Sequence, residues 1–125
     1  MNEINLKTTL GMDVSRNRIR INRSVLRAIG NPAYVQLLIN PESRIMAIRA
    51  VDRAKNGDQT YRMPKPTEDE EQQAVITSKT FMAKLTETFP DLCTGRSVQL
   101  SGIIVPSERI TLFSIDTMRI VNSNG

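Results

Sequence analysis

Short stretches of alternating polar and apolar residues, each followed by an apolar stripe of helical spacing, give the clearest structural signal in this chain. Arg18-Ile19-Arg20-Ile21 has the two-residue period of a half-buried strand, which leaves both arginines on the face opposite the isoleucines. Asn22 can accept a hydrogen bond from a free backbone amide as an N-cap. Apolar residues over 25–29 form one helical face, and Gly30 suits a left-handed stop. The pattern predicts a strand over 18–21 and a short helix that ends near Gly30.

The same order of elements recurs in the second part of the chain. Residues 74–77 read as a strand, and Ser78 is the expected N-cap of a helix that stops at Pro90. The apolar residues of this helix share one face, at Phe81, Met82, Leu85 and Phe89. We therefore predict a second strand-and-helix pair, whose helix is longer than the first.

A short sequence repeat accompanies this repeated order. Val35-Gln36-Leu37, followed by Pro41-Glu42-Ser43-Arg44-Ile45, returns as Val98-Gln99-Leu100, followed by Pro106-Ser107-Glu108-Arg109-Ile110. The offset is 63 residues at the first segment (98 − 35) and 65 at the second (109 − 44), so the second copy is two residues longer there. A unit of strand, helix and hairpin is too small to bury its own apolar face, whereas two units can bury theirs against each other. We therefore interpret the chain as a duplication.

Each helix is predicted to lead into a hairpin, because apolar or alternating runs flank turn-forming residues in both copies. The predicted strands are 34–39, 44–51 (where imperfect alternation fits a β-bulge), 97–105 and 108–115, with a last strand over 117–121. Residues 1–14 are polar with scattered apolar positions, so they form either an edge strand or a loose terminus.

Length and composition fit one small domain assembled from two half-units. We expect a first half-unit with an N-terminal extension over 1–53, a polar and acidic linker over 54–73, and a second half-unit over 74–125. Isoleucine and valine dominate the apolar residues, while there is no tryptophan and there are only three phenylalanines. This composition favours strands that pack through aliphatic side chains.

The residue types that are missing exclude several kinds of chemistry. Cys93 is the single cysteine and there is no histidine, which excludes an internal disulfide, a zinc finger and an imidazole base and is typical of a cytoplasmic protein. The sequence has no Gly-rich phosphate loop, no nucleophile elbow and no long apolar run. We therefore predict that the protein is not an enzyme and has no catalytic residues, no metal, no cofactor and no membrane contact.

Positive charge is concentrated in the first half-unit. Between Met12 and Arg53 lie eight arginines and three carboxylates (8 − 3 = +5), whereas the charge from Val75 to Gly125 is close to neutral. The linker holds the acidic run Glu68-Asp69-Glu70-Glu71, which is either a solvated connection or a segment that competes with an anionic partner for the arginines. An anionic partner is therefore expected to bind the first half-unit.

Residues 18–30 resemble the DNA-binding unit of the AbrB-like swapped-hairpin transcription factors. Ile21-Asn22 stands where that family has an Ile-Pro step, Arg27 where it has a basic helix residue, and Ile29-Gly30 where it has a Leu-Gly pair. Two copies in one chain resemble the MraZ branch of the same superfamily. The resemblance is carried by about residues 16–51 and, over 74–115, mostly by the internal repeat.

The resemblance implies a β-rich α+β fold, a duplicated swapped-hairpin (AbrB-like) small barrel with one short helix per half-unit. It also implies a DNA-binding transcriptional regulator whose partners are double-stranded DNA and further copies of the chain, as a homo-oligomer. Arginine suits this role because its planar fork pairs with phosphate or guanine. The implied DNA-binding residues are Arg16, Arg18, Arg20, Arg23 and Arg27.

The sequence departs from the family at several positions, which keeps other interpretations open. Asn22 replaces the proline, residues 77–78 are Thr-Ser with no arginine cluster before them, and the Asp-x-x-x-Arg signature of MraZ proteins is absent. The alternative is a non-catalytic assembly or scaffold protein of the same fold that does not bind DNA. In that case the alternating arginines only solvate the outer face of a strand. An antitoxin-like regulator is a third interpretation, although this chain has a second copy where such proteins have a toxin-binding tail.

Overall fold

A computed structural model describes residues 6–54, 59–65, 73–92 and 96–121, and strands account for 52% of them. The strands are β1 (Leu6–Asp13), β2 (Arg18–Ile21), β3 (Tyr34–Asn40), β4 (Ile45–Val51), β5 (Thr60–Arg62), β6 (Ala74–Thr77), β7 (Ser97–Val105) and β8 (Ile110–Ile120). The α-helices are α1 (Arg23–Ala28) and α2 (Lys79–Thr88), and short 3₁₀ turns are η1 (Val14–Arg16) and η2 (Pro106–Glu108). The fold is therefore β-rich with two helices, as the sequence predicts.

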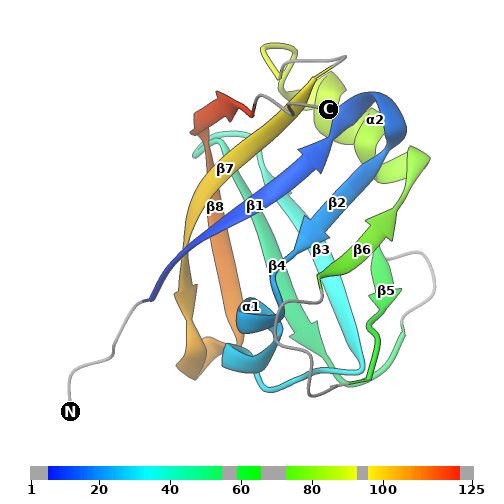
Figure 1. The fold of residues 1–125 in the computed structure, drawn as a ribbon, viewed down its shortest axis with the longest axis vertical. Coiled ribbons are helices and arrows are strands. Elements are labelled where there is room, and N and C mark those ends of the chain that lie inside the picture. Colours follow the sequence, from blue (N-terminus) through cyan, green and yellow to red (C-terminus); the bar gives the residue numbers. More distant parts are fainter. Residues whose placement is uncertain (1–5, 55–58, 66–72, 93–95, 122–125) are drawn as a thin grey trace.

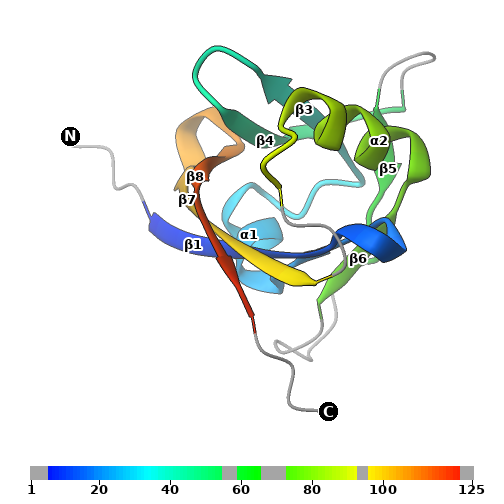
Figure 2. The same cartoon turned by 90° about the horizontal axis from the view of Figure 1, so that it is seen from above.

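All eight strands of the described residues form one antiparallel sheet in the order β5-β3-β4-β8-β7-β1-β2-β6. The sheet curls into a nearly closed barrel, and α1 and α2 lie at its opposite ends (Figures 1 and 2). β5 and β6 are the two ends of the sheet, and the Tyr61 hydroxyl on β5 donates to Ser78 Oγ just after β6 (2.8 Å). Neither helix in the described part of the chain has the length and apolar composition needed to cross a bilayer.

Strands from the two predicted half-units alternate around the barrel. β2 pairs with β6, β4 pairs with β8, and β1 lies between β7 and β2. β1 is thus a central strand and neither an edge strand nor a loose terminus, because it forms ladders on both sides. β5 falls inside the predicted linker over 54–73, and it pairs with β3 through Tyr34 and Arg62.

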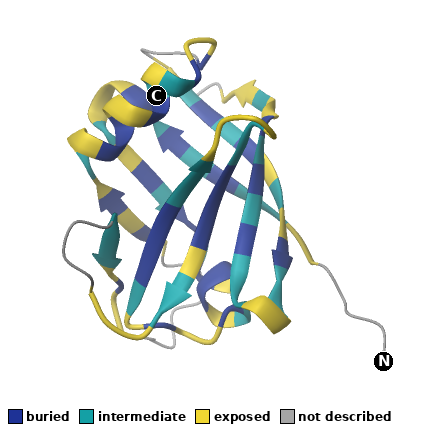
Figure 3. Cartoon of the chain, turned by 180° about the vertical axis from the view of Figure 1, so that it is seen from behind, coloured by how far each residue is buried: buried dark blue, intermediate teal, exposed yellow. Residues whose placement is uncertain are grey.

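The core lies inside the barrel and is made of the inward-facing positions of the strands and one face of each helix. Ile19 and Ile21 of β2 and Ile76 of β6 point inward, as the alternation predicts. The largest fully buried side chains include Phe81, Phe89 and Phe113. Exposed residues gather at the turns and along the outer side of α2 (Figure 3). Each fully buried aliphatic or aromatic side chain contributes on the order of 1.5–3 kcal/mol, so this aliphatic interior stabilises the barrel.

The two helices begin differently. Ser78 Oγ accepts a hydrogen bond from the Phe81 amide (3.1 Å), which is the N-cap that the sequence predicts. α2 ends at Thr88, with Phe89 as its C-cap residue directly before Pro90. Asn22 stands at the N-cap position of α1 but makes no capping hydrogen bond with its side chain. Its amide instead donates to the Thr9 carbonyl (3.3 Å) and its Oδ1 accepts from Gln73 (3.0 Å). The predicted N-cap position of Asn22 is confirmed, but the predicted side-chain capping bond is not formed, because tertiary partners occupy both ends of the side chain.

The two hairpin turns end in arginines with the same backbone conformation. Arg44 has φ 57° and Arg109 has φ 53°, which places both in the left-handed region. Each side chain crosses to the end of the helix in the other half: Arg44 bonds Asp91 Oδ2 (2.5 Å), and Arg109 Nε donates to the Ile29 carbonyl (3.1 Å). The turn arginines therefore connect each hairpin to the opposite half of the barrel.

Candidate nucleic-acid interface

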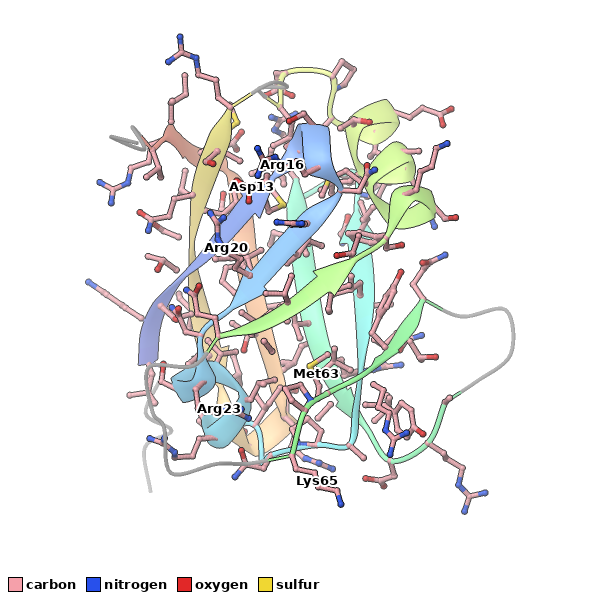
Figure 4. All side chains as sticks on the ribbon, turned by 45° about the vertical axis from the view of Figure 1, so that its right-hand side comes forward. Asp13, Arg16, Arg20, Arg23, Met63 and Lys65 are labelled. Carbon is pink, nitrogen blue, oxygen red and sulfur yellow. The ribbon has the colours of Figure 1, made fainter. Side chains whose placement is uncertain are left out.

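The predicted DNA-binding arginines divide into two groups at different ends of the barrel. Arg16 ends η1, and Arg18 and Arg20 lie on the outward side of β2, which begins directly after that turn. Arg23 and Arg27 lie on α1 at the other end, and Figure 4 shows Arg23 far from Arg16. The structure thus brings three of the five arginines together and separates the other two from them.

Arg20 is held by residues of its own chain. Its Nη1 donates to Asp13 Oδ2 (2.5 Å), and Asp13 also accepts from the Ser97 hydroxyl. The guanidinium turns its Nε–Nη2 edge toward Gly11, since a Cβ placed on that glycine would be 3.0 Å from both nitrogens. The Arg20 side chain is 31% exposed, so it retains a surface on which a phosphate could bind, but Asp13 offsets its charge.

Arg23 lies in the interior, although the sequence predicts it at the DNA-binding surface. It is 3% exposed, and its Nε and Nη2 atoms have no hydrogen-bond partner. A guanidinium at this depth has no access to a phosphate backbone. Leaving such a group without a partner costs stability, because the lost hydration is not replaced.

The sheet register adds an arginine that sequence reasoning missed. Arg119 on β8 lies opposite Gln99 on β7, Gln99 lies opposite Gly11 on β1, and Gly11 lies opposite Arg20 on β2. Arg119 is therefore in the same outward row as Arg20, and its Nε donates to Gln99 Oε1 (2.7 Å). The two arginines are 99 residues apart in the chain (119 − 20), so no local pattern in the sequence links them.

We call Arg16, Arg18, Arg20 and Arg119 the arginine face. It covers the outward side of β2, β1, β7 and the end of β8, and its one carboxylate in the described residues is Asp13, which lies opposite Arg18 in the β1–β2 ladder. Four cations and one anion leave a net charge of +3 (4 − 1). A surface of this composition attracts polyanions and favours guanidinium contacts with phosphate.

A second ionic cluster lies at the surface near the end of α2, and all of its partners belong to the same chain. Arg44 Nε donates to Asp116 (2.7 Å), its Nη2 bonds Asp91, and its guanidinium carbon lies 5.3 Å from the centre of the Phe89 ring. Side-chain hydrogen bonds to Asp116 and Asp91 raise the pKa of Arg44, and the bond from Arg44 holds the pKa of Asp91 below its ordinary value. Arg44 is therefore occupied by its own chain and is a structural residue.

Other predicted features do not add to a site. Glu68–Glu71 and Cys93 lie outside the described residues. Among the described residues, no group of three or more carboxylate, cysteine or histidine side chains is arranged to hold a metal ion. Met46, Met63 and Met82 are buried and belong to the hydrophobic core.

Function must be inferred from the arginine face and its surroundings, because similarity to other proteins gives no guide. No protein-family model, no curated protein and no solved structure matches this chain.

Proposed function

We propose that this protein is a DNA-binding transcriptional regulator, built as a duplicated swapped-hairpin barrel, that contacts the duplex through the arginine face. The observation that carries the proposal is the row of outward arginines on β2 and β8, which has one carboxylate among the described residues of that surface. Arg23 is buried and is left out of the DNA-binding residues, and Arg119 is included in its place. The proposal therefore keeps Arg16, Arg18 and Arg20 from the sequence prediction and adds Arg119.

The sheet register supports the duplication. When Arg44 is aligned with Arg109, Ala47 corresponds to Leu112, and these two residues face each other in the β4–β8 ladder. The Ala50 amide donates to the Arg109 carbonyl and the Ile115 amide donates to the Arg44 carbonyl, both at 2.9 Å. Two copies related by an approximate two-fold axis would make such reciprocal contacts.

The places of β1 and β5 in the sheet support a larger repeating unit than the sequence suggests. β1 flanks β7 of the second hairpin, and β5 flanks β3 of the first. With Val35 aligned to Val98, their partners Tyr61 and Met12 also correspond. Each copy would then contain strand, strand, helix and hairpin, and β5 would open the second copy rather than belong to a linker.

The arginine face would bind DNA mainly through its phosphates. Arg16 and Arg18 have exposed side chains, and a guanidinium can bond two phosphate oxygens at once. Each phosphate that is neutralised releases a condensed counterion, so three or four contacts give a slope of about −3 in log K against log salt. A homo-oligomer would present several arginine faces to one duplex and multiply these contacts.

A second candidate function is a non-catalytic assembly or scaffold protein of the same fold. It is favoured by the number of arginines that bond within the chain: Arg20 to Asp13, Arg44 to Asp91 and Asp116, and Arg109 to Asp52 (3.5 Å). Arginines used in this way stabilise the barrel and leave less charge for a polyanion.

The two functions are separated by measuring binding to a fluorescent random-sequence duplex at 50 mM and 200 mM salt. The test variant is Arg18→Gln with Arg119→Gln, and the matched control is Arg53→Gln with Arg62→Gln, which removes two exposed arginines outside the arginine face. If the protein binds DNA, affinity should fall steeply as salt rises. The test variant should lower the slope of log K against log salt by about two, one for each lost phosphate contact, and the control should keep the wild-type slope. The regulator proposal fails if the wild type does not bind at 50 mM salt, or if both variants lose the same affinity.

A further inference from the structure

The outer surface of the barrel has a second feature, an open cleft of about 760 Å³ over β1, β7, β8 and β4. Its walls are mainly aliphatic, with Ile45, Ile103, Val105 and Leu112 among the lining residues. Ile103 is 45% exposed, so part of its aliphatic surface remains open to water within the cleft. Apolar surface that stays open to water in a concave site is a common mark of a ligand.

The cleft is built by the backbone of the second hairpin. The β7–β8 register shifts between Gln99 and Ser101, and Gly102 follows directly. A Cβ on Gly102 would point into the barrel, 2.4 Å from the Leu112 carbonyl oxygen and 2.5 Å from the Phe113 ring, so this position requires glycine and its backbone forms part of the cleft lining. Thr117 Oγ1 accepts from the Ser101 amide (2.8 Å) and donates to the Ser114 carbonyl (2.6 Å), which fixes the shifted strands. The concavity therefore exists without a ligand.

Charge and polarity limit what can occupy the cleft. Lys7 is the one charged residue among the described residues that line it, and no carboxylate is among them. The hydroxyls of Thr9, Ser101 and Ser114 supply further polar contacts beside the aliphatic walls. The complementary ligand is an apolar body that carries a single anionic group. A second copy of this chain is a poorer match, because a self-complementary interface would bring two Lys7 side chains to a surface without a carboxylate.

We propose that this cleft binds an amphipathic carboxylate of the long-chain fatty acid class, whose hydrocarbon chain lies on Ile103 and Leu112 and whose carboxylate pairs with Lys7. The volume is within the usual range of about 300–1,000 Å³ for small-molecule sites. The inference stands independently of DNA binding, because none of the four residues of the arginine face lines the cleft.

The test is a fluorescence titration of the full chain with cis-parinaric acid and, separately, with its methyl ester. The wild type is expected to bind the acid saturably with one site per chain and to bind the ester about tenfold more weakly, because the ester cannot pair with Lys7. Lys7→Gln is expected to weaken the acid about tenfold and leave the ester unchanged. Lys84→Gln, an exposed lysine on α2, serves as the control and should bind the acid as the wild type does.

Ile103→Asp gives a second, independent variant, since it places a negative charge on the wall of the cleft and is expected to abolish binding of the acid. Its melting temperature is measured first, and Ile103→Ser replaces it if the aspartate unfolds the barrel. The proposal is overturned if the wild type does not bind the acid, or if Lys7→Gln binds the acid as tightly as the wild type does. It is also overturned if sedimentation shows a dimer whose formation competes with binding of the acid.

Discussion

The hairpin of β3 and β4 and the hairpin of β7 and β8 turn alike but pair differently. Both reach a left-handed arginine after the turn, yet three residues separate Leu37 from Pro41 and five separate Leu100 from Pro106. The first hairpin keeps a continuous register, whereas the second shifts register two residues before Gly102. The cleft lies beside this register shift, with Ser101, Gly102 and Thr117 among its lining residues. The two hairpins thus share the turn arginines that connect the halves of the barrel, and the places where they differ affect the outer surface.

The junctions between strand and helix also differ between the two halves. Here the first half is the irregular one, whereas among the hairpins it is the second. Lys79, the first helical residue of α2, is exposed, while Arg23 at the same place in α1 is buried without a hydrogen-bond partner for two of its nitrogens. α2 has ten residues and a serine cap, and α1 has six residues and none. Each half therefore departs from the shared pattern at a different point, and substitutions at matched positions can measure what each departure costs.

The largest effect is expected from Gly102→Ala, which would break the second hairpin. The new Cβ would meet the Leu112 carbonyl at 2.4 Å and Phe113 Cδ1 at 2.5 Å, so backbone or a buried ring must move. We expect a loss of about 3 kcal/mol in the free energy of unfolding, measured by urea denaturation.

The control is Gly11→Ala, in which the new Cβ meets only the end of the Arg20 side chain at 3.0 Å. That guanidinium can shift, so the cost is expected to stay below about 1 kcal/mol. Equal losses for the two alanines would mean that the tight approach at Gly102 does not shape the second hairpin.

The next effect is a gain, from Arg23→Met. Methionine keeps much of the buried stem and removes the unpartnered guanidinium, so we expect about 2 kcal/mol of added stability, visible as a higher melting temperature. Lys79→Met at the matched position of α2 is exposed and should change stability by less than about 0.5 kcal/mol. A loss of stability in Arg23→Met would show that the guanidinium has a partner in the folded protein.

A smaller effect separates the two helix starts. Ser78→Ala removes the acceptor for the Phe81 amide and for the Tyr61 hydroxyl, and is expected to cost about 1 kcal/mol in thermal unfolding. Asn22→Ala removes no cap and is expected to cost about half as much, through its bonds to Thr9 and Gln73. If Asn22→Ala is the more damaging change, the two junctions would not differ as their hydrogen bonds indicate.

Much of the local structure could be read from the sequence, because it depends on local chemistry. Alternation located β2, the Ser78 cap and Pro90 bounded α2, and Gly30 adopts the expected positive φ of 95°. The turn before Arg109 also lies where the proline and serine predict it.

The rest depended on partners far apart in the chain. No local pattern shows that β1 has a neighbour on each side, since its ladder with β7 joins residues about ninety positions away. The same holds for the site: alternation placed Arg18 and Arg20 outward, but the inward position of Arg23 and the approach of Arg119 depend on helix packing and sheet register. In the sequence Asp13 is only one of the three carboxylates between Met12 and Arg53, and its pairing with Arg20 depends on the β1–β2 ladder.

The smallest expected effect distinguishes the two turn arginines, Arg44 and Arg109, by how the melting temperatures of their variants depend on pH. Arg44 bonds Asp91, whose pKa it lowers, whereas the closest bond of Arg109 is to the Ile29 carbonyl (3.1 Å), which does not titrate. The ion pair of Arg109 with Asp52 is longer (3.5 Å) and highly exposed, so it adds little to the pH dependence. Because Arg44 lowers the pKa of Asp91 below its ordinary 3.8, this pairing stabilises the fold above that pH and is lost as pH falls through the lowered value. Arg44→Gln should therefore lower the melting temperature slightly at pH 7 and progressively less below about pH 4, a small effect since both side chains are partly exposed. Arg109→Gln should lower it by a similar amount at both pH values, and an NMR titration of Asp91 should show its pKa rise only in the Arg44 variant. An identical pH dependence for the two variants would mean that Arg44 and Arg109 hold their helices by the same interaction.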